Sequence, residues 1–256
     1  MLSSTSTPAL RRLRVPIGVA AVVLVFALWQ AVSIFTVAGR LSGSPMSAIA
    51  AVPNVFNDGL GAAALYSLRA LTVGMAISIV FGVIGGVLLG SIRWLAYLLE
   101  PAFMAFYVTP TVAILPLVVI WAGVGNASTT IIVVLSAIFP IVINTVAGVR
   151  QLDPQWTRSV IAYGGSRLTA FRLVALQGSL PEIVLGIRLG IGRALIGVIV
   201  AEMYASVQGV GSLLGTYSHA MRINELFVVV AFIGVFGFLI VQAVRVFEIR
   251  AGAWRQ

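Results

Sequence analysis

The sequence contains no cysteine and no lysine. The absence of cysteine excludes disulfides, thiolate nucleophiles and cysteine-ligated metals. All sixteen basic residues are arginine, and a Walker A phosphate loop needs its lysine. This chain therefore cannot bind ATP through such a loop, and we expect it to hold no cofactor of its own.

Charge is also scarce. Only 9% of the residues are charged and 60% are hydrophobic, whereas a soluble domain carries roughly a quarter charged residues. The composition predicts an all-α, polytopic bundle of transmembrane helices. The net charge of +9 is typical of basic cytoplasmic loops, so we expect the lipid bilayer, and no nucleic acid, as a partner.

Long uncharged segments predict about six spans. The chain begins with a polar tail, residues 1–14, and an uncleaved first span follows it. Residues 40–68 are mixed, which favours an external loop with a short helix on the membrane. The uncharged stretch 101–149 is long enough for two spans, with a break near Gly123 to Asn126. The predicted spans are 15–39, 70–92, two within 101–149, 183–204 and 226–244.

Arginine positions predict the orientation. With the N-terminus inside, eleven arginines fall in cytoplasmic segments, and three, Arg40, Arg69 and Arg222, fall outside. This positive-inside bias places both termini and the loop 150–181 of a multi-pass membrane protein in the cytoplasm. We divide the chain into the tail 1–14, the first helix with its external loop, 15–66, and a core domain, 67–256.

Small residues and prolines mark the helices that we expect to be buried. Small side chains repeat every four residues in the second span, where they would let another helix approach closely: Gly74, Ser78, Gly82, Gly86 and Gly90. Pro110 and Pro116 are predicted to interrupt the third span and Pro140 the fourth. Interrupted helices favour a cavity lining, with simple kinks as the alternative.

The polar loop between two apolar segments reads as a pair of short helices. Asp153 and Pro154 suit a helix start, and Gly164-Gly165 suits its end. Ser166 then caps a second helix that runs toward Gln177. Both helices have an apolar face, so the alternative to a partner-binding loop is a pair of amphipathic helices on the membrane surface.

Two charges lie inside the fifth span. Arg193 sits about half-way through it, where an unpaired charge is costly, and Glu202 is nine residues further on. At 100° per residue the two side chains point to opposite faces, about 180° apart. Arg193 therefore needs another partner. Structural pairing and lining of a translocation pathway both stay open for Arg193 and Glu202. Pro110 and Pro116 are further candidates for lining that pathway. His219 has too few companions for a metal site.

Several of these motifs together resemble the permease subunits of bacterial ABC importers, within the nitrate, sulfonate and taurine subgroup. The resemblance covers the chain from about Ser67 onward. The motifs that carry it are 140–150, PIVINTVAGVR; 186–188, GIR; 192–203, GRALIGVIVAEM; 209–211, GVG; and the loop pattern E-A-A, three residues, G, nine residues, I-x-L-P, in which Gly164 and 174–176 match.

The resemblance implies a type I, MetI-like importer fold with a cytoplasmic coupling loop that docks on an ATPase. The residues that it assigns to this loop are Arg158, Ser159, Val160, Gly164, Phe171, Val174, Leu176 and Pro181. The chain departs from the pattern at 158–160, where E-A-A is R-S-V, at Gln177 in place of a proline, and at Asn126 in place of an acid. The implied partners are ABC ATPases that bind the ATP, a second permease copy, identical or different, and a substrate-binding protein.

Two other functions compete with that of an ATP-driven permease. An ion-coupled secondary transporter commonly has inverted repeats, which this sequence does not show. An intramembrane enzyme needs a catalytic set at depth, and we assign no catalytic residue. Taurine, sulfonates, nitrate and aromatic or heterocyclic compounds all remain compatible with the subgroup as substrates.

Overall fold

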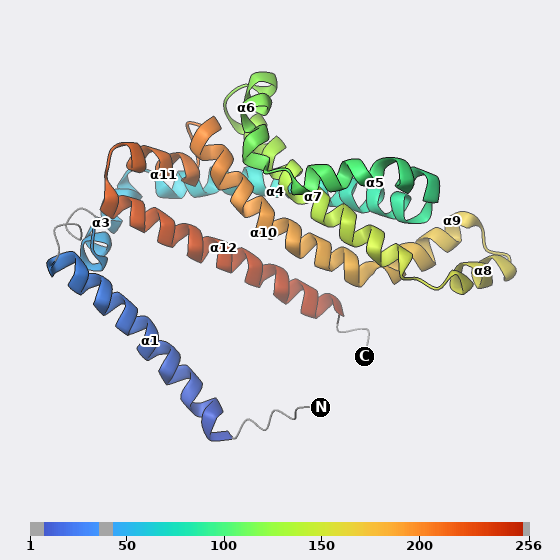
Figure 1. The fold of residues 1–256 in the computed structure, drawn as a ribbon, viewed down its shortest axis with the longest axis horizontal. Helices are drawn as coiled ribbons and strands as arrows, with labels where there is room; N and C mark the ends of the chain where they lie inside the picture. Colours follow the sequence, from blue (N-terminus) through green and yellow to red (C-terminus); the bar gives the residue numbers. More distant parts are fainter. Residues whose placement is uncertain (1–7, 36–42, 253–256) are drawn as a thin grey trace. The chain divides into compact units, whose positions relative to one another are not determined.

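The computed structural model describes residues 8–35 and 43–252, and within these ranges every regular element is a helix (Figure 1). The predicted all-α fold is confirmed. The helices are α1 Pro8–Phe35, α3 Pro45–Asn57, α4 Leu60–Ser91, α5 Arg93–Val108, α6 Thr111–Ala122, α7 Asn126–Arg150, α8 Pro154–Ala162, α9 Arg167–Ala170, the π-helical η1 Phe171–Leu176, α10 Leu180–Ala205, α11 Val210–His219 and α12 Ile223–Gly252.

The described residues form two compact units. One combines 8–35, 43–58 and 217–231, and the other combines 59–216 and 232–252. In the first unit, α3 confirms the short helix expected between the first two spans. The side chain of Ser44 accepts a hydrogen bond from the backbone N–H of Ser47 at 3.1 Å, and Ser47 reciprocates, which starts the helix with a capping box.

Four described helices are long and apolar enough to cross a membrane: α4, α7, α10 and, within α12, Ile223–Ala243. The pair α5 and α6 makes a fifth span if its two helices, bent by 99°, are counted as one. The first of the six predicted spans corresponds to α1, whose described apolar part is Val23–Phe35; residues 36–39 lie outside the described residues.

The predicted proline breaks are only partly right. The helix is interrupted at Pro110, which precedes α6, but Pro116 lies inside α6 and Pro140 inside α7. A proline removes one backbone donor, yet both helices continue through it. Pro140 is buried, whereas Pro116 is exposed. The break predicted between the third and fourth spans is confirmed, because Gly123 and Gly125 separate α6 from α7 with φ of 77° and 127°.

The second unit is built on α4, α7 and α10, which lie side by side (Figure 1). The small-residue stripe of α4 packs against α7. A Cβ at Gly82 would lie 2.8 Å from Ile141, and one at Gly86 would lie 2.5 Å from Thr145. Both members of these pairs advance by four residues in the same direction, so α4 and α7 run parallel at a separation that only glycine permits.

Helix α10 packs antiparallel on α7 through small residues of its own. Gly186 lies against Asn144, whereas Gly197, later in α10, lies against the earlier Ser136. Between these contacts the buried side chains of Ile141, Ile191 and Ala194 join the central apolar cluster. The three helices therefore share one core, and the loops at their ends are held at fixed spacing.

The start of the second span was predicted wrongly. Helix α4 begins at Leu60 rather than near Ala70. The sequence places Arg69 at the boundary, but the segment before it, 60–66, is rich in alanine and leucine, which favour helix. The extension matters because it brings Ser67, a buried residue, to the end of α10.

Candidate functional site: the loop 150–181 and the α5–α6 bend

The polar loop folds as the local sequence predicts. The side chain of Asp153 accepts a hydrogen bond from the backbone N–H of Gln155 at 2.8 Å, and Pro154 occupies the first turn of α8. The helix ends in a Schellman turn. Gly165 N–H donates to the carbonyl of Val160 at 2.9 Å, and Gly164, at φ +85°, donates to Ile161 at 3.0 Å.

The second half of the loop begins with the predicted serine cap. The side chain of Ser166 accepts from the backbone N–H of Thr169 at 3.1 Å, and α9 passes into the π-helical segment η1. Phe171, Val174 and Leu176 of this segment are half-buried. Pro181 lies in the first turn of α10, so the loop joins the core directly at a proline.

The aromatic side chains on the apolar face of α8 are not buried by other described residues. Trp156 is 68% exposed and Tyr163 is 93% exposed. Arg158 and Ser159 are exposed beside them, whereas Val160 is half-buried and packs against Gly165. Figure 1 shows α8 and α9 at one end of the α7 and α10 pair. The loop thus presents aromatic side chains and a cation on a projecting surface, as a docking element would.

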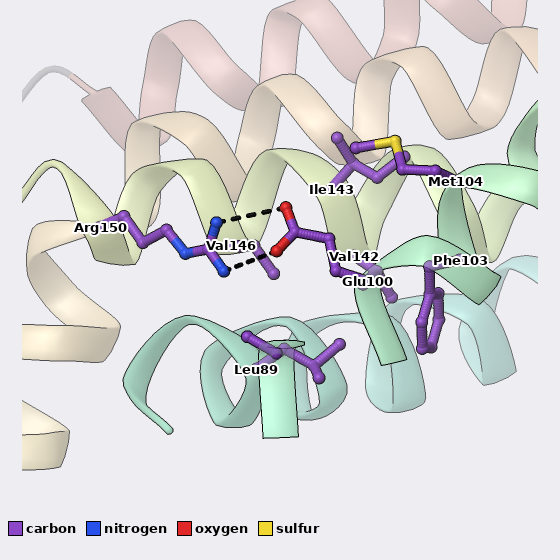
Figure 2. Close-up of a pocket in the computed structure, with 9 residues that line it drawn as sticks. Leu89, Glu100, Phe103, Met104, Val142, Ile143, Val146 and Arg150 are labelled. Carbon is purple, nitrogen blue, oxygen red and sulfur yellow. Dashed lines mark hydrogen bonds and ion pairs between the residues drawn. The ribbon is translucent and has the colours of Figure 1, made fainter. Parts of the chain in front are cut away.

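A bidentate ion pair fastens the base of this loop. Arg150, the last residue of α7, donates to both carboxylate oxygens of Glu100 in α5, at 3.2 and 2.9 Å (Figure 2). Both side chains are near 40% exposed, so the pair contributes at most about 1 kcal/mol. Its geometric role is to tie α5 to the point where the chain enters the loop.

Arg193 meets a neighbouring helix, one of the partners left open by the sequence. Its guanidinium carbon lies 4.5 Å from the centre of the Tyr107 ring in α5. Tyr107 is the second-last residue of α5 and lies just before the bend between α5 and α6. Beyond the bend, α6 and α10 enclose an open groove of about 460 Å³ whose lining residues are Val112, Leu115, Pro116, Val119, Ile120 and Tyr204.

Glu202 lies on the opposite face of α10 and is fully buried. This burial favours structural pairing over lining of a pathway. Its Oε2 accepts hydrogen bonds from the hydroxyl of Ser67 at 2.7 Å and from the backbone N–H of Gly211 at 3.0 Å. Ser67 in turn accepts from Val210 N–H at 3.0 Å. A Cβ at Gly209 would fall on the carboxyl group, so the motif 209–211 needs its glycines to fold around Glu202.

The first unit holds a separate polar cluster. The hydroxyl of Tyr217 donates to Asp58 at 2.8 Å, and Arg222 pairs with both Asp58 and Glu225, at 3.1 and 3.0 Å. Desolvation raises the pKa of Tyr217 to about 12, and the bond to Asp58 acts in the same direction. The pKa of Arg222 is also raised, chiefly by its hydrogen bond to Glu225. Both groups therefore keep their protons at neutral pH.

Sequence reasoning missed the partner in each of these contacts. Glu100, Tyr107 and Ser67 lie 50, 86 and 135 residues from Arg150, Arg193 and Glu202. The unpaired Arg193 signalled that a partner was needed but could not identify it, because the pairing depends on tertiary packing.

The fold and the projecting loop define a class: a multi-pass, helical membrane protein with a polar loop that projects from its helical core. Comparison with known proteins makes this specific. A family model described as "Binding-protein-dependent transport system inner membrane component" matches residues 78–250. The chain belongs to this family, which is one of transport permeases of the inner membrane.

Three curated relatives illustrate the range of the family. The chain is 27% identical to the taurine transport system permease protein TauC of Escherichia coli over 73% of this chain and 68% of the relative. It is 27% identical to the putative aliphatic sulfonates transport permease protein SsuC of Bacillus subtilis over 91% and 85%. It is also 27% identical to the nitrate import permease protein NrtB of Synechocystis over 75% and 70%. The resemblance seen in the sequence is confirmed.

Proposed function

We propose that this chain is the membrane-spanning subunit of an ATP-driven importer for a small taurine-, sulfonate- or nitrate-like solute. The family and the three relatives support transport of this kind, and they do not favour an ion-coupled secondary transporter. The chain performs no catalysis of its own. ATPase subunits bind the ATP, a substrate-binding protein delivers the solute, and a second permease copy completes the pathway.

The observation that carries the proposal is the uncovered surface of the loop. Trp156 on α8 and Tyr163, its C-cap residue, are exposed, and a Schellman turn and an Asp153 cap fix the two ends of this helix. Exposed aromatics on a rigid helix suit the groove of a separate protein. We propose that residues 154–176 contact the ATPase and that Arg158, which stands where the family has an acid, meets a carboxylate or carbonyls there.

Substitution of Gly164 tests the loop as the coupling element. Its φ of +85° disfavours a β-branched residue, although a Cβ at this position would meet nothing within 4 Å. Gly164→Val should therefore cost about 1–2 kcal/mol of backbone strain, redirect α9 and detach the ATPase. Gly164→Asn is the matched control, because asparagine tolerates the left-handed region and should retain the complex.

The measurement is co-purification of the ATPase and its transport-coupled hydrolysis. Arg158→Glu restores the family's charge and should weaken coupling, because the partner surface is matched to arginine. If Gly164→Val keeps a bound, coupled ATPase, the loop is not the coupling element. If Arg158→Glu improves both readouts, a partner adapted to arginine is ruled out.

A further inference from the structure

Arg193 is a fixed charge half-way along a membrane span. It follows the start of α10 at Leu180 by thirteen residues and precedes its end at Ala205 by twelve. The residue is exposed. Among the side chains that the structure describes, its recorded partner is Tyr107, and none of the described ion pairs includes it. Its positive charge is therefore not neutralised within the described chain.

A lipid-facing position does not fit this residue. The cost of a cation at the centre of a bilayer exceeds what a single cation–π contact returns. Tyr107 also adjoins the bend at 109–110, where helical backbone is interrupted. Such breaks occur at membrane depth where they are covered by protein or line a water-filled cavity. Phe106, Val108 and Pro110 around the bend are exposed, so the described residues of this chain do not cover the bend, which leaves a water-filled cavity or a second permease copy beside this face.

The same face of α10 continues to the groove. Tyr204 follows Arg193 by eleven residues, which places it about 20° away around the helix and roughly 16 Å along it. Tyr204 lines the groove of about 460 Å³ with α6 residues such as Pro116. Arg193, Tyr107, Pro116 and Tyr204 thus belong to one continuous wall, on which Arg193 carries the charge.

We propose that Arg193, held by Tyr107, is an anion-binding subsite on this wall that receives the oxyanion group of the transported solute. A guanidinium stacked on a ring keeps its edge N–H groups free, and these match two oxygens of a nitrate, sulfonate or carboxylate. The inference deepens the function proposed above and rests on it for the identity of the cargo. It adds a selectivity: the wall attracts small anions and repels cations.

The absence of cysteine gives a direct test. Ile196 lies one turn from Arg193 on the same face and is 66% exposed, so Ile196→Cys introduces a single thiol into this chain. The variant is placed in nanodiscs with the subunits that co-purify. It is then treated separately with sulfonatoethyl and trimethylammonioethyl methanethiosulfonate, and modification of this chain is followed by mass spectrometry. Val73→Cys, at an exposed site on α4, is the control that we expect to face lipid.

The ratio of the anionic to the cationic reaction rate is the readout. Adding Arg193→Met should lower this ratio roughly tenfold, as expected for loss of a unit charge about 6 Å away in water. Sodium nitrate and sodium ethanesulfonate should slow the anionic reaction when Arg193 is present, relative to sodium chloride at equal ionic strength. Tyr107→Leu, which frees the guanidinium from its ring, should weaken this protection.

Two results would overturn the subsite. If neither reagent modifies Ile196→Cys, this face meets lipid. If Arg193→Met leaves the ratio of reaction rates unchanged, a carboxylate, such as one from a second copy, already neutralises the charge. The test is independent of the ATPase. A bound ATPase with an unchanged ratio rejects the subsite and leaves the proposed importer. A changed ratio with no ATPase bound rejects the importer and leaves an anion-attracting wall without an assigned cargo.

Discussion

At the scale of single residues, Glu202 shows how a buried acid can organise a turn. Its Oε2 accepts two hydrogen bonds, while Oε1 is buried without a partner among the described residues. Through Ser67, the carboxyl group satisfies the N–H of Val210 as well as that of Gly211. These are two of the first backbone donors of α11, which a helix cannot satisfy internally. Glu202 and Ser67 together therefore fix where α11 starts.

We predict that Glu202→Ala and Glu202→Gln differ in their effect on α11. Glutamine keeps one side-chain oxygen for Ser67 and Gly211. Alanine leaves the backbone N–H of Gly211 unsatisfied, at about 1–3 kcal/mol, and leaves the hydroxyl of Ser67 with the carbonyl of Ala63 as its acceptor. Hydrogen–deuterium exchange over Val210–His219 should rise strongly in Glu202→Ala and little in Glu202→Gln. Equal exchange in both variants would show that the hydrogen bonds do not hold the helix.

The sequence was sufficient to predict that Glu202 and Arg193 lie on opposite faces of one helix, but not to identify their partners. Helical periodicity alone placed the two charges on opposite faces, and the structure confirms it, with Glu202 buried and Arg193 exposed. Ser67 was out of reach because the predicted span began three residues after it. Tyr107 was out of reach because its position depends on the bend of α5 and α6.

At the scale of elements, a pattern of small residues predicted close packing, and the structure supplied its partner. The stripe of α4 faces α7 along its length, from Gly74 to Gly90. Caps and glycine ends were equally readable, since Asp153, Gly164 and Ser166 act within a few residues of their own positions. The start of α4 could not be predicted in this way. The continuity of α6 and α7 through Pro116 and Pro140 could not either, because local sequence rules place a helix break at a proline.

Adjacent glycines in α4 allow a matched test of this packing. A Cβ at Gly86 would meet Thr145 and the carbonyl of Val142, at 2.5 and 3.0 Å, whereas one at Gly85 would meet nothing within 4 Å. Gly86→Leu should therefore force α4 and α7 apart and cost 3 kcal/mol or more, about the upper range for overpacking. Gly85→Leu should stay close to the wild type. Folded yield in detergent, measured by size-exclusion chromatography, compares them, and equal yields would place the stripe against lipid.

At the scale of the whole molecule, helix directions and arginine positions agree on one arrangement. The parallel pair α4 and α7 and the antiparallel α10 put Ser91, Arg150 and Leu180 at the same end of the second unit. Arg93 and the whole loop 150–181 follow at that end. Two parallel membrane helices must be joined by an odd number of membrane crossings. Between α4 and α7, the bent pair α5 and α6 supplies one crossing.

This arrangement predicts the topology of the full chain. Because cytoplasmic segments collect arginine, we expect the loop at 151–153 and the end of α12 inside, and the segment 205–222 outside. Fusions of green fluorescent protein, which fluoresces only inside, and alkaline phosphatase, which is active only outside, should therefore give opposite results after Arg250 and within 205–222. A fusion after Gln151 is the internal control and should match the one after Arg250. The same side for Arg250 and 205–222 would show that α12 does not cross the membrane.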